Sequence, residues 1–423
     1  MSHKIAIIGL GYVGLPLAVE FVKKYQVVGF DINQDRVHEL NQGHDSTLEV
    51  NDHELSKVLD VNEKVGLKLS CDVNDIKDSN IYIVTVPTPV DRNKRPILTP
   101  LVKASETVGK ILKQNDIVIY ESTVYPGVTE DECVPVLEKY SGLKFNVDFF
   151  CGYSPERINP GDKKHTVANI KKVTSGSTPK IGKIVDDLYK SIITAGTHLA
   201  PTLKVAEASK VIENAQRDVN IAFVNELAII FNKLGIDTHD VLEAAATKWN
   251  FLPFKPGLVG GHCIGVDPFY LAKKAQEAGY YSEIILAARR LNDSMAEFVA
   301  TEILKLMVKN NINPNAANIL MLGFTFKENC SDIRNTKAID LYNSLSQYNS
   351  IVHVYDPKAN REEVKSCYDI ELLPELVKFY DVIILVVGHS EFLELDLGKL
   401  RTENSFVYDV KGILPKNIIE NRL

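Results

Sequence analysis

The feature that most constrains this chain is a glycine-rich turn, "GLGYVG", placed directly after an apolar run near its start. The run "KIAIIGL" is typical of a buried strand, and "GYVGLPLAVEFVKKY" has helical spacing. In a unit of strand, turn and helix, Gly9, Gly11 and Gly14 permit the tight turn, the close approach of a pyrophosphate and tight helix packing. The plain alternative is a set of glycines that serves helix packing alone.

An acidic residue in the next strand favours the dinucleotide interpretation. "QVVGFDIN" is predicted as a strand, and Asp31 closes it at the position where a carboxylate binds both ribose hydroxyls. Because that role disfavours a 2'-phosphate, we predict NAD rather than NADP as the cofactor.

Strands and helices alternate through the first half of the chain. Further strands are predicted at "IYIVTVPTP", "DIVIYEST" and "FFCGYSPER", and a helix between the first two opens with Thr99 as its cap and Pro100 at its first position. This alternation predicts a parallel, doubly wound sheet. We assign residues 1–200 to an NAD-binding Rossmann domain.

The region from residue 201 to 234 differs, because no internal proline or glycine interrupts it before Gly235. It predicts one helix, far longer than the usual length of about 11 to 12 residues. Alternation then returns with strands at "NILMLGF", "IVHVYDP", "DVIILVVG" and "SFVYDV". The predicted fold is therefore α/β, with two doubly wound Rossmann-like domains joined by a long central helix. We place the central helical and dimerisation region at 201–312 and the second Rossmann-like domain at 313–423.

Composition excludes several classes of protein. The 423 residues are 45% hydrophobic and 24% charged, enough for a large core, and the net charge of -7 argues against a general nucleic-acid surface. Six cysteines show neither a CxxC pair nor zinc spacing, so we expect a reducing compartment and no metal site. The apolar runs are too short for a signal peptide or a membrane span. We expect a cytoplasmic protein.

Two polar residues on the long helix share a face. Lys210 and Asn214 are four residues apart, and Arg217 continues that face. With Glu207 and Glu213 nearby, the simple interpretation is an ordinary charged helix surface. The chemical alternative is a lysine and an amide that project together into a cleft and stabilise an oxyanion or relay a proton.

A single cysteine, Cys263, stands in the glycine-rich stretch "GGHCIG". Most cysteines of this kind are buried structural thiols, and we interpret the other five that way. Around Cys263, however, the bare backbone lets a substrate approach, and a helix capped by Asp267 begins shortly afterwards. Asp267 has the alternative interpretation of a cap only. His262 is left unassigned, because adjacent residues commonly point apart.

Polar residues also follow strand ends, where a doubly wound sheet binds its ligands. "ESTVYPG" carries Thr123, and "GYSPERINPGDKKH" carries Glu156 and Arg157. In the second α/β domain, "GFTFKENCSDIRNT" carries Lys327 and Arg334, which suggests a second nucleotide-like ligand. The alternatives are turn chemistry for the first two loops and solvated surface cations for the third.

Taken together, these motifs resemble the UDP-glucose/GDP-mannose dehydrogenase family over essentially the whole chain. "GLGYVGLPLA", "ESTVYPG", "SPER", "EASKVIENAQRDVNIAFVNE", "GGHCIGVDP" and "GFTFKENCSDIRNT" occur in the order of the family. The closer resemblance is to bacterial UDP-N-acetylhexosamine 6-dehydrogenases of the Vi-antigen type, through "INPGDKKH" and "WNFLPFKPGLVGGHC". Pro160 stands where the UDP-glucose branch has another acid, which disfavours a plain UDP-glucose substrate.

The resemblance implies a four-electron oxidation of the C6 alcohol of a UDP-N-acetylhexosamine, GlcNAc or GalNAc, to the uronic acid with two NAD, for surface polysaccharide biosynthesis. It implies that the Cys263 thiolate forms a thiohemiacetal and then a thioester, which water hydrolyses. By the same resemblance, Lys210 and Asn214 stabilise the oxyanion, Asp267 positions the lysine or a water, Glu156 is the base for hydrolysis, and Thr123 holds the water.

The resemblance also implies the binding residues and the assembly. It places NAD on Gly9, Gly11, Tyr12, Val13, Gly14, Asp31, Arg36, Thr88, Thr123 and Arg334. It places the UDP-sugar on the C-terminal domain and on Glu156, Arg157, Lys210, Asn214, Arg217, Phe254, Gly257, Gly260, Phe326 and Lys327. It implies at least a homodimer packed through the long helix, with no nucleic-acid or membrane partner.

Three alternatives stay open. The first is a UDP-glucose 6-dehydrogenase. The second is a two-electron hydroxyacid dehydrogenase, whose relatives also carry a lysine and an asparagine one turn apart; Cys263 and the second α/β domain argue against it. The third is a catalytically silent nucleotide-sugar-binding protein, which the full set of catalytic positions disfavours.

Overall fold

The computed structural model describes residues 3–59, 66–91, 95–158, 166–261, 264–376 and 379–423. The chain forms two compact units. The N-terminal unit comprises Met1–Glu213 and Phe269–Gly279, and the C-terminal unit comprises Asn214–Pro268 and Tyr280–Leu423. The three-part division drawn from the sequence stays a prediction.

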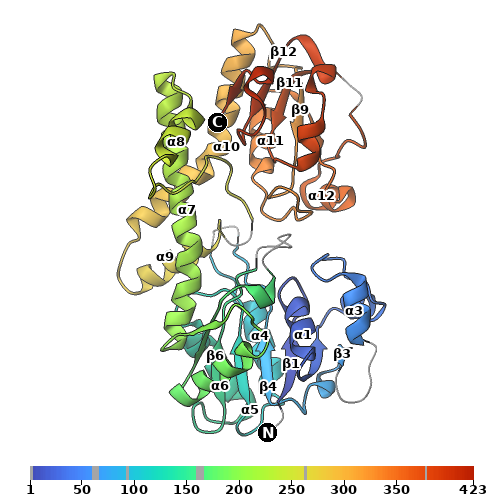
Figure 1. Cartoon of the computed structure of the whole chain (residues 1–423), viewed down its shortest axis with the longest axis vertical. Helices are drawn as coiled ribbons and strands as arrows, with labels where there is room; N and C mark the ends of the chain where they lie inside the picture. The colour runs from blue at the N-terminus through green and yellow to red at the C-terminus, as the bar shows by residue number, and fades with distance from the viewer. Residues whose placement is uncertain (1–2, 60–65, 92–94, 159–165, 262–263, 377–378) are drawn as a thin grey trace. The chain divides into compact units, whose positions relative to one another are not determined.

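The N-terminal unit is built on an eight-stranded sheet (Figure 1) with the strand order β3-β2-β1-β4-β5-β6-β7-β8. Strands β1 to β6 are parallel, as the alternating pattern predicts. The last pair differs, because β7 runs antiparallel to β6 and β8 is parallel to β7. The strands are β1 (Lys4–Ile8), β2 (Gln26–Phe30), β3 (Leu67–Ser70), β4 (Ile81–Val84), β5 (Ile117–Tyr120), β6 (Phe150–Tyr153), β7 (Lys172–Gly176) and β8 (Thr197–Leu199).

Helices cover both faces of this sheet. On one face, α1 (Gly14–Val22) and α6 (Pro179–Lys190) join a core with Ile5, Ile7 and Ile83. On the other face lies α4 (Thr99–Gly109), where the Ser105 and Tyr120 hydroxyl oxygens are 2.7 Å apart. The remaining helices of the unit include α2 (Gln34–Asn41), α3 (Asp52–Leu59) and α5 (Val134–Ser141), which follows a π-helical turn at Thr129–Cys133.

The predicted cap of α4 is wrong in one detail. Thr99 is the first residue of the helix, and Leu98 occupies the cap position without a side-chain hydrogen bond. Pro100 lies in the first turn, as expected, where a missing amide hydrogen costs nothing.

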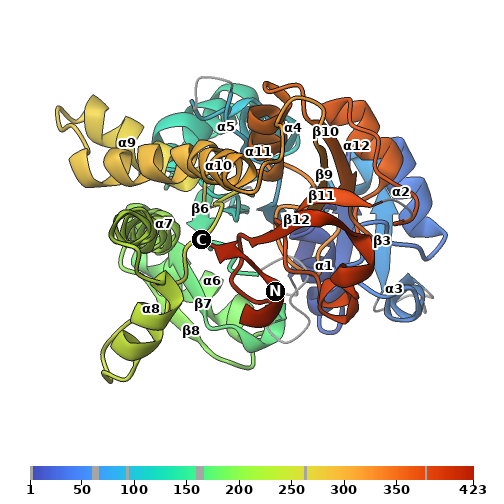
Figure 2. The ribbon, with the colours of Figure 1, turned by 90° about the horizontal axis from the view of Figure 1, so that it is seen from above.

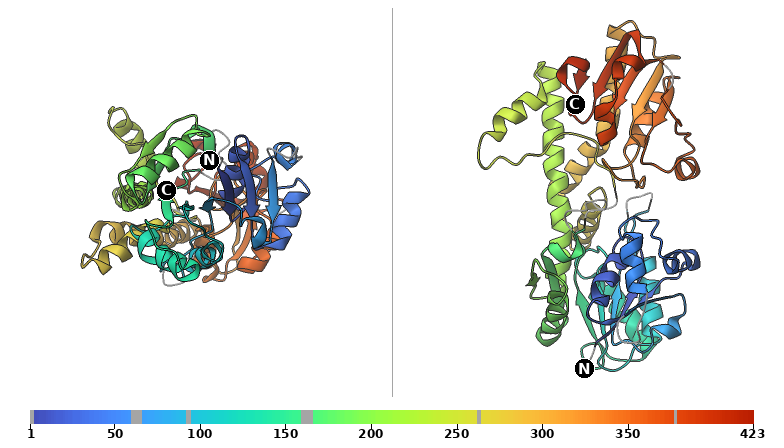
Figure 3. Two further views of the ribbon diagram at one scale, coloured as in Figure 1. Left: turned by 90° about the horizontal axis from the view of Figure 1, so that it is seen from below. Right: turned by 45° about the vertical axis from the view of Figure 1, so that its right-hand side comes forward.

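The predicted long helix is confirmed as α7 (Leu203–Leu234). Figure 2 looks along its axis, and the right-hand view of Figure 3 shows it in profile as one unbroken helix. Three further helices follow it in the chain: α8 (Thr238–Ala246), α9 (Asp267–Glu277) and α10 (Glu283–Lys309).

The C-terminal unit contains a five-stranded parallel sheet with the order β10-β9-β11-β12-β13. Helices α10 and α11 (Ala338–Ser346) share a buried core with one face of this sheet. The second Rossmann-like fold predicted from the sequence is therefore present. Its other elements are β9 (Asn318–Leu322), β10 (Ile351–Tyr355), α12 (Arg361–Tyr368), β11 (Tyr380–Leu385), β12 (Arg401–Asp409) and β13 (Asn421–Arg422).

Candidate active site

The glycine turn has the geometry of a dinucleotide cradle. Gly9 has a φ of +97°, which L side chains rarely adopt. A Cβ on Gly14 would lie 1.8 Å from the Gly9 carbonyl oxygen, so only glycine fits there. A Cβ on Gly11 would meet nothing within 4 Å, which leaves open space at the start of α1. The half-buried Tyr12 and Val13 complete the turn. These features suit the pyrophosphate of NAD, which would lie at this helix N-terminus.

Asp31 directly follows β2 and is tied to the glycine turn. One carboxylate oxygen accepts a hydrogen bond from the Leu10 amide at 2.8 Å, and the other accepts one from the Asn33 amide at 2.9 Å. Each oxygen keeps a free lone pair for a ribose hydroxyl. The next residue, Ile32, is 82% exposed and carries no charge that would attract a 2'-phosphate. The local chemistry therefore fits NAD.

Arg36, predicted to bind the cofactor, is already engaged by the protein. Its Nε donates to the Leu10 carbonyl oxygen at 3.0 Å, and its guanidinium pairs with Asp45 at 2.7 Å. The first contact ties Arg36 to the glycine turn, and the second ties it to the loop after α2. A direct contact of Arg36 with NAD stays a prediction.

Two predicted residues meet at the ends of neighbouring strands. Thr88 follows β4 and Thr123 follows β5, and the Thr88 hydroxyl donates to the Thr123 carbonyl oxygen at 2.6 Å. The Tyr270 hydroxyl on α9 donates to the Thr88 carbonyl oxygen at 2.7 Å. Because β4 and β5 are adjacent, the two loops form one continuous rim at the carboxyl ends of the strands.

Glu156, the predicted base for hydrolysis, is only 9% exposed and lies just after β6. Its carboxylate lies 2.7 Å from the Lys172 ammonium and accepts the Ile158 amide at 2.7 Å. Lys172 was not among the predicted site residues, because it belongs to no recognised motif. The neighbouring Arg157 side chain pairs with Glu213 and donates to the Lys171 carbonyl oxygen at 3.0 Å.

The buried face of α7 is polar. Glu207, Lys210, Asn214, Asp218 and Asn225 are each less than 9% exposed, and their spacing keeps them on one side of the helix. The charged-surface interpretation is therefore wrong for this face. Arg217, which was expected to continue it, is exposed.

Glu207 shows how this polar face is stabilised. It is fully buried, and its carboxylate accepts hydrogen bonds from the Gly127 amide, from the Thr129 amide at 3.0 Å and from the Thr129 hydroxyl at 2.7 Å. Burial raises the pKa of Glu207 above its ordinary value. Glu207 thereby anchors the turn that follows the Thr123 loop to the first turns of α7.

Asp267 contacts one of the predicted catalytic residues directly. It is 2% exposed, it begins α9, and its carboxylate accepts a hydrogen bond from the Asn214 side-chain amide. Asp267 therefore does more than cap a helix. Cys263 and His262 lie outside the described residues, so the predicted nucleophile stays a prediction.

The segment from Gly257 to Gly261, which precedes Cys263, has little conformational freedom. The Asn225 side chain bonds the Gly257 amide at 2.8 Å and the Gly257 carbonyl at 3.1 Å. A Cβ on Gly260 would lie 2.6 Å from the Asn335 carbonyl oxygen, and one on Gly261 would lie 2.8 Å from the Phe326 ring. Both glycines allow this segment to lie directly against the loop that follows β9. Phe254 is half-buried in the same segment.

A pocket opens in the C-terminal unit beyond the carboxyl ends of β9 and β11, where a ligand was predicted. Lys327, Phe326 and Gly260 from the sequence analysis line it. Lys337 and Lys411 also line it and were missed, since neither belongs to a recognised motif. Its lining residues are Leu258, Gly260, Thr325, Phe326, Lys327, Glu328, Thr336, Lys337, Ala338, Val386, Val387 and Lys411.

The charges of this pocket suit an anion. Three lysines and one acid, Glu328, line it, and the Lys411 ammonium lies 3.7 Å from the Glu328 carboxylate. The excess of positive charge suits a diphosphate. Although burial lowers the pKa of Lys337, Asp293 at 3.0 Å and Asp340 at 2.7 Å raise it above the ordinary value, so the side chain stays charged. Arg334 is not among the lining residues; its guanidinium pairs with Asp332 at 2.7 and 2.9 Å.

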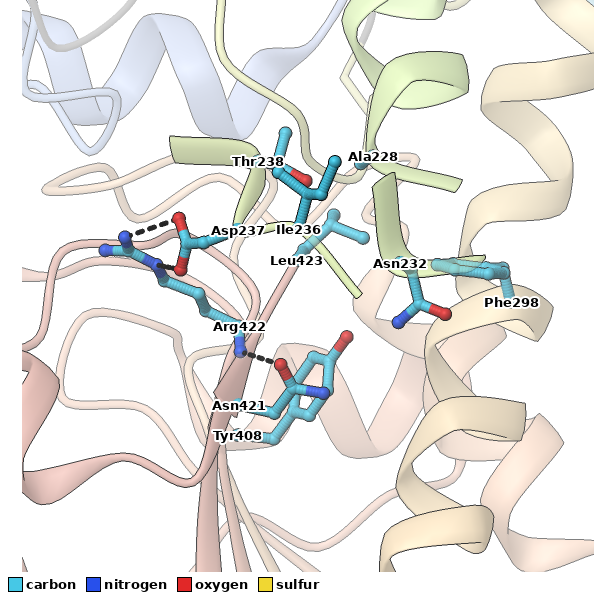
Figure 4. Close-up of a pocket in the computed structure, with 10 residues that line it drawn as sticks. All are labelled: Ala228, Asn232, Ile236, Asp237, Thr238, Phe298, Tyr408, Asn421, Arg422 and Leu423. Atoms are coloured by element: carbon cyan, nitrogen blue, oxygen red, sulfur yellow. Dashed lines mark hydrogen bonds and ion pairs between the residues drawn. The ribbon is translucent and has the colours of Figure 1, made fainter. Parts of the chain in front are cut away.

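A second pocket contains none of the predicted residues (Figure 4). The Arg422 guanidinium closes one side of it by pairing with the Asp237 carboxylate at 2.7 and 3.0 Å. It is lined by Ala228, Asn232, Ile236, Asp237, Thr238, Phe298, Tyr408, Asn421, Arg422 and Leu423.

Two searches of the described part of the chain found no site or segment of the kind sought. No cluster of three or more histidine, cysteine or acidic residues there has a geometry that could hold a metal ion. None of the helices described has the length and apolar character needed to cross a membrane.

Comparison with known proteins assigns a family to each part of this architecture. Residues 3–193 match the NAD binding domain of the UDP-glucose/GDP-mannose dehydrogenase family, residues 204–294 its central domain, and residues 320–416 its UDP binding domain. The resemblance drawn from the motifs is thus confirmed.

Relatives match over the whole length. A UDP-N-acetyl-D-glucosamine 6-dehydrogenase of Pseudomonas aeruginosa is 59% identical over 424 residues, which cover 99% of each chain. A protein of the same name from Salmonella typhi is 56% identical and covers 99% of this chain and 98% of its own. The solved structure of a UDP-D-ManNAc dehydrogenase from Pyrococcus horikoshii has 31% identity and a TM-score of 0.89, with 99% and 98% coverage. The chain belongs to the UDP-glucose/GDP-mannose dehydrogenase family and is an NAD-dependent dehydrogenase of nucleotide sugars.

Proposed function

We propose that the protein oxidises the C6 hydroxyl of UDP-N-acetylglucosamine, or of a closely related UDP-N-acetylhexosamine, to the carboxylate. The observation that carries this proposal is the buried polar face of α7, where Lys210 and Asn214 are held one turn apart and Asn214 bonds Asp267. Burying an ammonium and an amide is costly unless they have partners, and a reacting oxygen is such a partner. The names of the relatives at 59% and 56% identity support the choice of substrate.

The proposed chemistry assigns each residue a step. Bound NAD supplies the hydride acceptor, and two NAD are consumed for each sugar. In the first oxidation C6 gives up a hydride and its hydroxyl gives up a proton to a water positioned by Asp267, which leaves the aldehyde; the Lys210 ammonium and the Asn214 amide donate to the C6 oxygen as negative charge develops on it. The Cys263 thiolate adds to the aldehyde, and loss of a second hydride leaves a thioester. Glu156 takes a proton from water, which attacks the thioester, releases the carboxylate and regenerates the thiol.

The lysine-lined pocket supports a UDP-sugar rather than a simple hydroxyacid. Lys327, Lys337 and Lys411 match the charge of a diphosphate, and a two-electron hydroxyacid dehydrogenase has no use for that site. A UDP-glucose 6-dehydrogenase would share the pocket, so the sugar must be tested directly. A panel of UDP-glucose, UDP-GlcNAc, UDP-GalNAc and GDP-mannose with NAD makes that test.

The decisive assay counts NADH for each sugar consumed. We expect two NADH and one uronate with UDP-GlcNAc or UDP-GalNAc. One NADH with a free aldehyde would refute the thioester route, and no NADH with any sugar would favour a silent binding protein. Cys263→Ser should abolish uronate formation while NAD still binds, whereas Cys367→Ser, at an exposed cysteine, serves as the matched control.

We further propose that the protein is a homodimer associated through α7. Five apolar side chains of the helix are 43 to 63% exposed. Because a helix turns by about 100° per residue, these positions fall within about 20° of one line, opposite the polar buried face. They are Val205, Ile212, Phe223, Ile230 and Leu234. Light scattering should give a dimer for the parent and for a control, Lys233→Ala, at an exposed position about 80° away from that line, and a monomer for Phe223→Asp.

A further inference from the structure

A cluster of buried charges contacts Glu156 and is not used in the proposed chemistry. The Lys172 ammonium lies 2.7 Å from Glu156 and 2.7 Å from Glu121, and it is 2% exposed. Glu121, 1% exposed, also accepts a hydrogen bond from the Tyr189 hydroxyl. One ammonium therefore joins two carboxylates, and only one of these carboxylates has a proposed role.

The cluster depends on the one reversal in the sheet. Glu121 directly follows β5, and Glu156 follows β6, so both lie at the carboxyl edge of the parallel strands. Because β7 runs antiparallel to β6, its first residue, Lys172, lies at that same edge. Tyr189 reaches the cluster from α6, which packs on β7. A parallel β7 would have put Lys172 at the opposite edge.

The geometry makes the two carboxylates unequal. Glu156 also accepts the amides of Arg157 and Ile158, so three donors surround its charge. Glu121 receives the same ammonium and one hydroxyl, deeper in the protein. Burial, with the charge of Glu156 nearby, raises the pKa of Glu121 to about 7. Burial would also raise the pKa of Glu156, but Lys172 and the two amides lower it below its ordinary value.

Two further groups of the described residues lie near the cluster. The Arg157 guanidinium pairs with Glu213 on α7 rather than with Glu156. The Tyr189 ring lies 5.6 Å from the Lys172 ammonium. Despite burial, the two carboxylates raise the pKa of Lys172, so it stays charged. Within the described part of the chain, Lys172 is the ammonium that contacts Glu156.

We propose that Lys172 and Glu121 are positioning residues for Glu156: Lys172 keeps Glu156 ionised and oriented as a base, and Glu121 holds the Lys172 ammonium from its other side. The inference rests on the proposed role of Glu156 in hydrolysis. A base must be unprotonated to take a proton from water, and a buried carboxylate without a cation would be neutral at physiological pH. Lys172 removes that difficulty, and Glu121 fixes the place of its ammonium.

The two residues make different predictions for the pH profile, which a purely structural ion pair does not. In Lys172→Met the carboxylate of Glu156 loses its cation, its pKa rises, and the acidic limb of uronate release moves to higher pH by roughly 1 to 3 units. Because the pKa of Glu121 is about 7, Glu121 is already protonated at the lower pH where Glu156 titrates, so Glu121→Gln should leave that limb in place. The first hydride transfer and the Kd for NAD should change in neither variant.

The experiment is a single-turnover measurement of both NADH phases and of uronate between pH 5 and 9. Tyr189→Phe is the matched control, because it removes only a hydroxyl bonded to Glu121. The parent is tested first: if it does not yield two NADH per uronate, the proposed function fails. If the parent does so and Lys172→Met leaves the limb where it is in the parent, or Glu121→Gln raises it as far as Lys172→Met does, the inference fails.

Folding of the variants is checked by thermal denaturation, since Lys172→Met leaves two buried carboxylates unpaired. Should it not fold, the double variant Glu121→Gln/Lys172→Met removes one negative charge together with the positive one. Infrared difference titration then follows the carboxyl groups without turnover. We expect one band that titrates near pH 7 in the parent and is absent in Glu121→Gln; a band that persists in Glu121→Gln would overturn the assignment.

Discussion

Replacing Glu207 should damage both stability and turnover, although it lies outside the proposed chemistry. Glu207→Ala leaves the Gly127 and Thr129 amides buried without an acceptor, while the Thr129 hydroxyl can rotate. An unsatisfied buried group costs about 1 to 3 kcal/mol, so two cost about 2 to 6 kcal/mol. Removal of a buried carboxylate, whose pKa burial raises, offsets part of this cost. We expect a net loss of about 3 kcal/mol.

Glu207→Gln should cost less stability than Glu207→Ala, because an amide offers one acceptor oxygen in place of the two of a carboxylate. It can satisfy one of the two backbone amides, so we expect about half of the loss. Urea unfolding measures the free energy of unfolding, and the same preparations give kcat, which should fall because the Thr123 loop loses its anchor. Glu226→Gln, at an exposed position of the same helix, is the control and should change stability by less than about 0.5 kcal/mol. An equal loss in Glu207→Ala and Glu226→Gln would refute the reasoning.

Three further predictions test the cradle, the anion pocket and the second pocket. Gly14→Ala should raise the Kd for NAD at least tenfold in a fluorescence titration, because its Cβ would lie 1.8 Å from the Gly9 carbonyl oxygen; unchanged affinity would contradict this. Lys411→Ala should weaken UDP binding, measured by calorimetry, and reduce the salt dependence of that binding. Arg422→Ala should lower stability above about pH 4: burial alone would raise the pKa of Asp237, but Arg422 holds that pKa at about 2, so the stability that the pair contributes is lost as pH falls from about 4 through 2. Acid unfolding, followed by circular dichroism, should show a weaker dependence of stability on pH between about 4 and 2 in the variant than in the parent.

The local features of the site could be predicted from the sequence, because each depends on interactions between neighbouring residues. The glycine turn, the acid that closes β2 and the uninterrupted α7 are all properties of neighbouring residues, and the structure has all three. Lys327 also lies in a pocket at the predicted edge of its sheet, since the carboxyl ends of parallel strands always meet there.

Contacts between residues far apart in the chain could not be predicted from the sequence. Lys172 follows no motif, and only the reversal of β7 brings it to Glu156 and Glu121. Lys337 and Lys411 join Lys327 through the packing of three separate segments. Periodicity gives a strand its faces, but the direction in which it enters the sheet is decided by pairing with its neighbour.

The helix α7 shows which features the sequence determines and which the tertiary structure decides. Its spacing alone determined that Lys210 and Asn214 share a face, and that apolar residues share another. Which side chains are buried was decided only by the fold. The buried side of α7 carries Lys210 and Asn214 beside apolar residues such as Val211 and Val224, whereas the stripe of Val205, Ile212, Phe223, Ile230 and Leu234 is exposed in the single chain. Buried charges are stable only when partners from other elements satisfy them, and those partners come together only in the folded chain.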